Sequence, residues 1–144
     1  MSSSLKMRRT ITFFGYWMDE LVGYLTVYKS HHGDLLTVLR IAVKKKFRRN
    51  YIATHMFESL RLMVLYDDRF SDVTHIVTHV RDTNRVALSL FSSLGFLFDK
   101  LINGSVENIV RMTYCVHKTD TRRFVHYQHI PIQGGFEFGV DYDD

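Results

Sequence analysis

The sequence predicts a mixed α/β (α+β) fold, in which helices pack on a mixed, mostly antiparallel sheet. Two observations point to it. Residues 10–43 are rich in β-branched and aromatic residues and are broken only by short polar turns, which is typical of strands. The apolar spacing then changes to that of a helix, and a strand, a second helix and two strands follow. A strand–helix–strand unit therefore lies within an otherwise antiparallel sheet.

Three strands are expected at the start of the chain. The segments 10–17, 21–29 and 35–43 read TITFFGYW, LVGYLTVYK and LLTVLRIAV, and each suits a strand. The stretches MDE and SHHGD between them are turn sequences. Because both connections are short, we expect an antiparallel meander.

Two helices are predicted from apolar repeats. Ile52, Met56, Leu60 and Val64 recur every four residues, which indicates an amphipathic helix of about four turns. The sequence YDDRFSD ends this helix, and VTHIVTHV at 73–80 predicts a fourth strand.

The second helix is expected to pack through a stripe of Val86, Leu90 and Leu94. The sequence RDTN before it supplies N-cap side chains, and Gly95 suits its end.

A hairpin and an irregular tail are expected after the second helix. FLFDKLI and IVRMTYCV flank the pair Asn-Gly at 103–104, which is a strong hairpin signal. The chain reads as one domain, 1–144, with a core at about 10–116 and a C-terminal extension at 117–144. The tail is long and aromatic, and we expect it to cover the open edge of the first strand or a neighbouring subunit.

The composition restricts the class of protein. Hydrophobic residues make up 46% and charged residues 24%, as in a globular domain, and the net charge of +4 permits an acidic partner without requiring one. No apolar run is long enough to span a membrane, and MSSSLKMRRT does not resemble a signal peptide. The single cysteine, Cys115, fits an intracellular protein of the cytoplasm or nucleus and reads as a buried strand residue.

A basic loop joins the third strand to the first helix. It reads VKKKFRRNYIA from residue 43 to 53. Helix N-termini present free N–H groups and a positive dipole end, so such a loop can hold phosphates. Charge alone favours a solvated loop or a nucleic-acid patch. A nucleic-acid binder would need a continuous basic face, and the acidic end DYDD argues against that reading.

The position of this loop resembles the acetyl-CoA loop of the GNAT superfamily of N-acyltransferases. There an aliphatic residue ends a strand, and Arg/Gln-x-x-Gly-x-Gly/Ala opens a helix five residues on. Val43, Arg48, Ile52 and Ala53 fit this pattern, with Tyr51 at the glycine position.

A second GNAT motif, Asn-x-x-Ala-x-x-x-Tyr-x-x-x-Gly-Phe, is matched by Asn84, Ala87, Gly95 and Phe96, with Phe91 at the tyrosine. The resemblance implies a GNAT-like fold and acetyl-CoA as acyl donor. The cofactor-binding residues that it implies are Ile41, Ala42, Val43, Arg48, Arg49, Asn50, Tyr51, Ile52, Ala53, Asn84 and Phe91.

The sequence HVRDTN is similar to the His-Val-x-x-x-Asn motif of protein N-terminal acetyltransferases within that superfamily. This resemblance implies that His79 is the general base that takes a proton, through water, from an attacking α-amine. The alternative for His79 is a half-buried histidine bonded to backbone. His75, four residues earlier on the same strand face, is expected to be structural, and no metal site is expected.

Three departures from the family pattern leave an alternative open. Tyr51 replaces a glycine, Phe91 lacks the hydroxyl of a general acid, and Thr37 replaces a tyrosine for which Asp34 and Tyr28 are candidate substitutes. The segment before residue 10 is also too short for the strand and two helices that usually wall the acceptor site. The tail, a second subunit or another protein partner could supply that wall.

If the protein is an enzyme, we expect it to transfer acetyl to an amine. The favoured acceptor is a peptide N-terminus, and the alternative acceptor is a small amine or polyamine. The alternative is a catalytically weak or inactive GNAT-like module that binds CoA or a protein partner.

Overall fold

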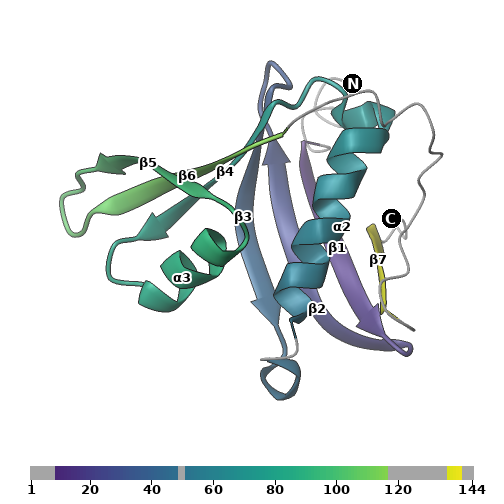
Figure 1. The fold of residues 1–144 in the computed structure, drawn as a ribbon. Coiled ribbons are helices and arrows are strands. Elements are labelled where there is room, and N and C mark those ends of the chain that lie inside the picture. Colours follow the sequence, from purple (N-terminus) through teal and green to yellow (C-terminus); the bar gives the residue numbers. More distant parts are fainter. Residues whose placement is uncertain (1–8, 49–50, 117–135, 141–144) are drawn as a thin grey trace.

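The computed structural model describes residues 9–48, 51–116 and 136–140, and its elements follow in the predicted order (Figure 1). Seven strands form one sheet in the order β5-β6-β4-β3-β2-β1-β7. The neighbouring pairs are antiparallel except β3 and β4, which run parallel. This arrangement confirms the mixed, mostly antiparallel sheet with a central strand–helix–strand unit.

The first three strands form the predicted meander. They are β1 (Thr10–Trp17), β2 (Glu20–Lys29) and β3 (Leu35–Val43). Met18 and Asp19 join β1 to β2 with φ angles of 50° and 71°, the left-handed backbone that suits a two-residue hairpin turn.

The crossover from β3 to β4 (His75–Arg81) contains the longer helix, α2 (Ile52–Tyr66), flanked by the short 3-10 turns η1 (Lys45–Phe47) and η2 (Asp68–Phe70). The four-residue repeat predicted the buried face of α2 correctly. Its repeating residues are all buried, and they are Ile52, Met56, Leu60 and Val64.

The buried face of the second helix, α3 (Arg85–Ser93), differs from the predicted one. Val86 is 82% exposed, whereas Phe91 is buried and its ring centroid lies 5.1 Å from that of Phe96. The helix is rotated from the predicted stripe because Phe91 completes an aromatic cluster with α2 and the sheet. Leu94 and Gly95 follow the helix, and the φ of 102° at Gly95 confirms that it terminates the helix.

The predicted hairpin consists of β5 (Leu97–Ile102) and β6 (Ile109–Cys115). Its connection spans 103–108, so Asn103 and Gly104 begin a longer loop rather than forming a two-residue turn. Within this loop Gly104 approaches the Glu107 backbone so closely that a Cβ would lie 2.2 Å from the Glu107 carbonyl oxygen, so a side chain would clash at this position.

The tail supplies the last strand, β7 (Phe136–Val140), which pairs antiparallel with β1. Phe138 stacks on Phe13 with a centroid distance of 5.1 Å, and both rings are buried. The prediction that the tail covers the edge of the first strand is thus confirmed for this segment. The remainder of the tail, 117–135 and 141–144, lies outside the described residues.

Both helices pack over the same face of the sheet. The Phe57 ring of α2 lies 5.2 Å from Phe96, which follows α3, and 5.2 Å from Tyr114 of β6. We call the opposite sheet face the far face. By the strand register it carries, among others, Tyr28, Thr37, His79 and Arg111. No helix in the described ranges is long and apolar enough to cross a membrane.

Candidate active site

The parallel strands β3 and β4 separate toward their carboxyl ends. Their pairing runs from Leu35 opposite His75 to Val38 opposite Thr78 and goes no further. Beyond that point β3 continues with β2 alone, and β4 continues with β6 (Figure 1). Both sequence motifs follow directly from these diverging ends, so the fold brings the basic loop, His79 and Asn84 to the same end of the sheet.

His79 is exposed on the far face of β4, between the buried residues Thr78 and Val80. Strand alternation explains this placement, because neighbouring side chains point to opposite faces. Arg111 of β6 stands directly opposite His79, and Lys100 of β5 stands opposite Arg111. Partial desolvation of the ring and the charges of Arg111 and Lys100 lower the pKa of His79. The imidazole is therefore neutral at pH 7 and able to accept a proton.

His75 lies four residues before His79 on the same face of β4 and is half-buried. Its Nδ1 is 2.9 Å from the hydroxyl of Thr74, and its partner on β6 is Cys115, which is exposed rather than buried as expected. Among the described residues, no three His, Cys, Asp or Glu side chains are grouped to hold a metal ion.

The basic loop is held in place by its own side chains. Arg48 donates from Nε to the Val43 carbonyl at 3.1 Å, and Lys46 forms an ion pair with Glu20 at 3.0 Å. Lys44 and Lys45 are exposed, and no hydrogen bond or ion pair of their side chains is found among the described residues. Arg49 and Asn50, also predicted to bind the cofactor, lie outside the described residues.

Tyr51 occupies the N-cap of α2 in the left-handed conformation, with φ 61° and ψ 24°. Glycine adopts this conformation without strain, whereas a residue with a Cβ does so at some cost. The side chain makes no capping hydrogen bond and is 75% exposed, so it points away from the core. The backbone thus keeps the shape of a glycine loop at the start of α2, where Ile52 and Ala53 begin the helix and their N–H groups have no partner within it.

The other predicted cofactor residues have distinct environments. Ile41, Ala42 and Val43 belong to the part of β3 that has left β4, and they pair only with β2. Asn84 caps α3, its Oδ1 accepting from the Ala87 N–H at 3.1 Å, which confirms the predicted N-cap. Phe91 is only 5% exposed, so its ring belongs to the core rather than to an open surface.

Tyr28 stands next to Thr37, the position at which the resemblance to N-terminal acetyltransferases implies a tyrosine. It is directly opposite Thr37 in the register of β2 and β3, on the far face. Asp34, the other candidate, is exposed and accepts a hydrogen bond from Ser30 within the turn. Tyr28 therefore has its side chain on the far face beside Thr37, whereas the Asp34 carboxylate belongs to the turn.

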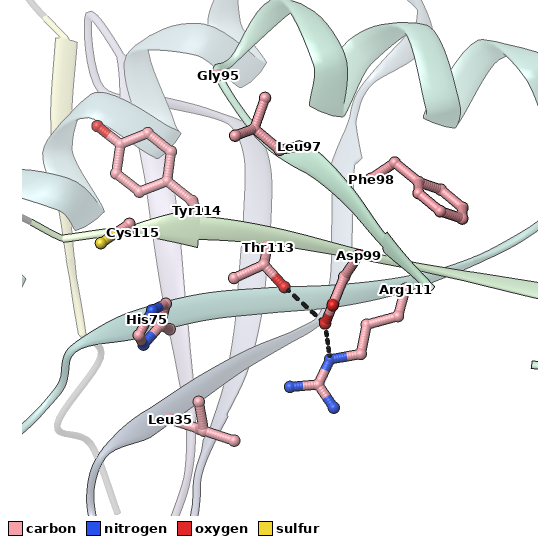
Figure 2. A pocket seen from close by; sticks show the side chains of 10 residues that line it. All are labelled: Leu35, His75, Gly95, Leu97, Phe98, Asp99, Arg111, Thr113, Tyr114 and Cys115. Carbon is pink, nitrogen blue, oxygen red and sulfur yellow. Dashed lines mark hydrogen bonds and ion pairs between the residues drawn. The ribbon is translucent and has the colours of Figure 1, made fainter. Parts of the chain in front are cut away.

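A hollow of about 550 Å³ lies further along the far face, around the start of β4 and the β5–β6 hairpin (Figure 2). It contains His75 rather than His79. Asp99 Oδ2 is the centre of its polar side, with an ion pair to Arg111 Nε at 3.0 Å and a hydrogen bond from Thr113 at 3.2 Å. Arg111, which stands opposite His79, also lines the hollow, so the hollow and the His79 site share this residue.

Sequence reasoning did not identify Arg111 and Lys100 as neighbours of His79. Each lies on a different strand, and nothing in the local sequence gives the register that aligns them. The one available signal was the hairpin itself, because a strand that pairs with the motif strand must place some side chains beside His79.

Comparison with known proteins gives a family. The model of the acetyltransferase (GNAT) family matches residues 4–96, which is more than half of the chain. No curated protein matches the sequence.

Solved structures share the fold at low identity. Ard1 from Thermoplasma volcanium is similar with a TM-score of 0.58 and 19% identity, over 69% of this chain and 66% of that one. The ribosomal-protein-S18-alanine N-acetyltransferase from Escherichia coli has a TM-score of 0.63 and 18% identity, over 82% of this chain and 76% of that one. A GNAT family acetyltransferase from Elizabethkingia anophelis with acetyl-CoA bound has a TM-score of 0.63 and 14% identity. The similarity covers 79% of this chain and 81% of that one.

The diverging parallel strands, the basic loop before α2 and the capped start of α3 agree with this match in order and position. The chain belongs to the acetyltransferase (GNAT) family.

Proposed function

We propose that the protein transfers an acetyl group from acetyl-CoA to an amine, most favourably the α-amine of a peptide. The observation that carries this proposal is the position of His79. It is an exposed histidine with a lowered pKa, on the strand whose end has separated from β3. A neutral imidazole at that place suits the removal of a proton from an ammonium or amine.

Acetyl-CoA binds between the diverging ends of β3 and β4 in this proposal. The backbone of Ile41 to Val43 holds the pantetheine, and the loop from Arg48 to Ala53 holds the pyrophosphate at the start of α2. Support for this fit comes from the glycine-like backbone at Tyr51 and from the exposed Lys44 and Lys45 before it. Asn84 keeps its amide N–H groups for the pantetheine, since only its oxygen caps the helix.

Transfer proceeds by direct attack in a ternary complex. The amine nitrogen forms a bond to the thioester carbonyl carbon, and His79 removes a proton from that nitrogen through water. The carbon–sulfur bond then breaks, and the departing thiolate takes up a proton to give CoA. Phe91 cannot donate that proton because it has no hydroxyl and is buried. By register Tyr24, opposite Ala42, and Tyr28, opposite Thr37, are the tyrosines of β2 on the far face, and solvent is the other source.

A binding module without catalysis is the second candidate. Two observations favour it: the strained Tyr51 at the predicted pyrophosphate loop and the absence of a hydroxyl at Phe91. Loss of one general acid lowers a rate by on the order of 10²–10⁴ without abolishing transfer by proximity. Tyr51 bears on cofactor binding itself and is the more serious difference.

Calorimetry with acetyl-CoA, followed by transfer assays, separates the two candidates. The acceptors are a peptide with a free α-amine, the same peptide with a blocked α-amine, and a polyamine. Binding with transfer only to the free peptide supports the proposal. Transfer only to the polyamine corrects the acceptor class. Binding without transfer favours the module, and an absence of binding at millimolar acetyl-CoA overturns the cofactor site.

A further inference from the structure

The edge strand β5 is apolar, and none of the described residues covers its outer edge. Leu97, Phe98, Leu101 and Ile102 are 73%, 64%, 49% and 37% exposed. Figure 1 shows β5 at the outer edge of the sheet, at the opposite end from β7. Proteins usually shield such an edge, because its free backbone groups can pair with another strand. An exposed edge with large apolar side chains therefore marks a surface for strand addition.

The pattern of apolar and charged residues in β5 is the same in either direction. It reads LFDKLI, so an antiparallel copy centred between Asp99 and Lys100 would place apolar residues opposite apolar ones. The same register places each Asp99 opposite the Lys100 of the other strand. Opposite charges facing each other across a strand pair are stabilising, and like charges are destabilising.

A β-bulge at Asp99 makes the side-chain faces agree with this register. Phe98 pairs with Met112 and Lys100 with Arg111, so Asp99 is the extra residue. Lys100 therefore shares the far face with Arg111, and Asp99 is on that face too, since it bonds to Arg111 (Figure 2).

In a regular strand, neighbours point to opposite faces, and Asp99 could not meet Lys100 about a two-fold axis. With the bulge, the order of faces from 97 to 102 is far, helix, far, far, helix, far. It reads the same from either end.

Asp99 and Lys100, at the centre of β5, have charged atoms that are available for further contacts. Asp99 uses only Oδ2 for Arg111 and Thr113, and no contact of its Oδ1 is found among the described residues. Lys100 is exposed, and the described residues offer its ammonium no hydrogen bond or ion pair. Within the described residues, each chain thus presents one carboxylate oxygen and one ammonium without a partner at the edge.

We propose that β5 pairs antiparallel with β5 of a second copy of this chain, forming a symmetric dimer with one continuous sheet. Leu97 then lies opposite Ile102 of the copy, and Phe98 lies opposite Leu101. Two Asp99–Lys100 ion pairs flank the two-fold axis. The pairing strand is short, so the interface is at the small end of specific contacts, and the dimer dissociates on dilution.

Charge substitutions give a test that does not depend on any enzymatic activity. Sedimentation velocity on the full chain should show a dimer that increases with concentration. Asp99→Lys places lysine against lysine, and Lys100→Asp places aspartate against aspartate, so each variant should be monomeric. An equimolar mixture of the two restores opposite charges at both positions and should form a heterodimer. The double exchange D99K/K100D should dimerise by itself.

Two controls keep the result interpretable. Asp72→Lys makes the same charge change on a distant exposed loop and should leave the dimer intact. Thermal unfolding checks that Asp99→Lys, which loses the Arg111 ion pair, remains folded; Lys100→Asp breaks no contact within the described chain. A monomer at every concentration overturns the proposal. Single variants that still dimerise, or a mixture that stays monomeric, overturn it as well.

Discussion

His79 of β4 and Arg111 of β6 stand directly opposite each other, with both side chains on the sheet face away from the helices. An arginine beside a proposed general base disfavours the protonated imidazole. The Asp99 carboxylate forms an ion pair with the Nε of Arg111 at 3.0 Å. The pKa of His79 therefore depends on residues of the β5–β6 hairpin as well as on its own strand.

Removal of the Arg111 charge should raise the pKa of His79. In Arg111→Gln one of the two cationic neighbours that lower this pKa is gone, whereas Arg111→Lys keeps a cation there. NMR titration of the His79 ring should show a higher pKa in the glutamine variant and a nearly unchanged pKa in the lysine variant. Equal pKa values in all three proteins would show that the Arg111 charge does not contribute to the lowered pKa.

Replacement of His79 by alanine should lower acetyl transfer by on the order of 10²–10⁴ while acetyl-CoA affinity is kept. Because the pKa of His79 is lowered, its base form is present at more acidic pH than for an ordinary histidine. The rate should therefore rise through a pKa below about 6.5 and stay level through neutrality. His75→Ala is the matched control and should keep the rate. An unchanged rate in His79→Ala at every pH would assign that histidine a structural role.

Replacement of Tyr51 by glycine should stabilise the fold. The left-handed backbone at φ 61° costs a non-glycine residue about 1 kcal/mol, and glycine removes that strain. Urea unfolding should show a gain in the free energy of unfolding for Tyr51→Gly but not for Tyr51→Ala. Equal stabilities in the three proteins would contradict the strained conformation.

The same variant tests the role of the Tyr51 ring in cofactor binding. The side chain is 75% exposed, which favours a ring that lies outside the loop and contacts the cofactor. Calorimetry should then show weaker acetyl-CoA binding in both Tyr51→Gly and Tyr51→Ala. Tighter binding in the glycine variant would instead identify the ring as an obstacle.

Loss of the loop arginines should weaken CoA binding. The double variant of Arg48 and Arg49 to alanine removes two cations beside the N-terminus of α2, and the loss of affinity should be larger at low salt, where charges are less screened. Arg9→Ala, at the start of β1, removes a cation elsewhere and should leave affinity unchanged. A double variant that binds as tightly as the parent would exclude the loop from the cofactor site.

The tail strand should contribute strongly to stability. Phe138→Ala removes a fully buried ring that stacks on Phe13 and should lower the free energy of unfolding by roughly 3 kcal/mol. Glu137→Ala, at an exposed position of the same strand, is the control. Deletion of 121–144 should expose the edge of β1 and cause aggregation. A soluble, monomeric and equally stable truncated chain would refute this role.

The sequence by itself determined the elements whose signals are local. The four-residue repeat from Ile52 to Val64 gave α2 and its buried face, because one side of that helix meets a broad apolar sheet. Asn84 as the cap of α3 could likewise be predicted, since capping involves only the next three residues. The two family motifs were readable for the same reason.

Only the tertiary structure decided the relationships between distant segments. Phe91 is buried and the predicted core residue Val86 is exposed, because the aromatic cluster around Phe96 sets the rotation of this short helix. The register of β4 and β6 placed Arg111 beside His79, and the tail joined the sheet beside β1 through backbone hydrogen bonds that any sequence can make. Periodicity shows which side of an element is apolar, whereas packing and register decide what that side meets.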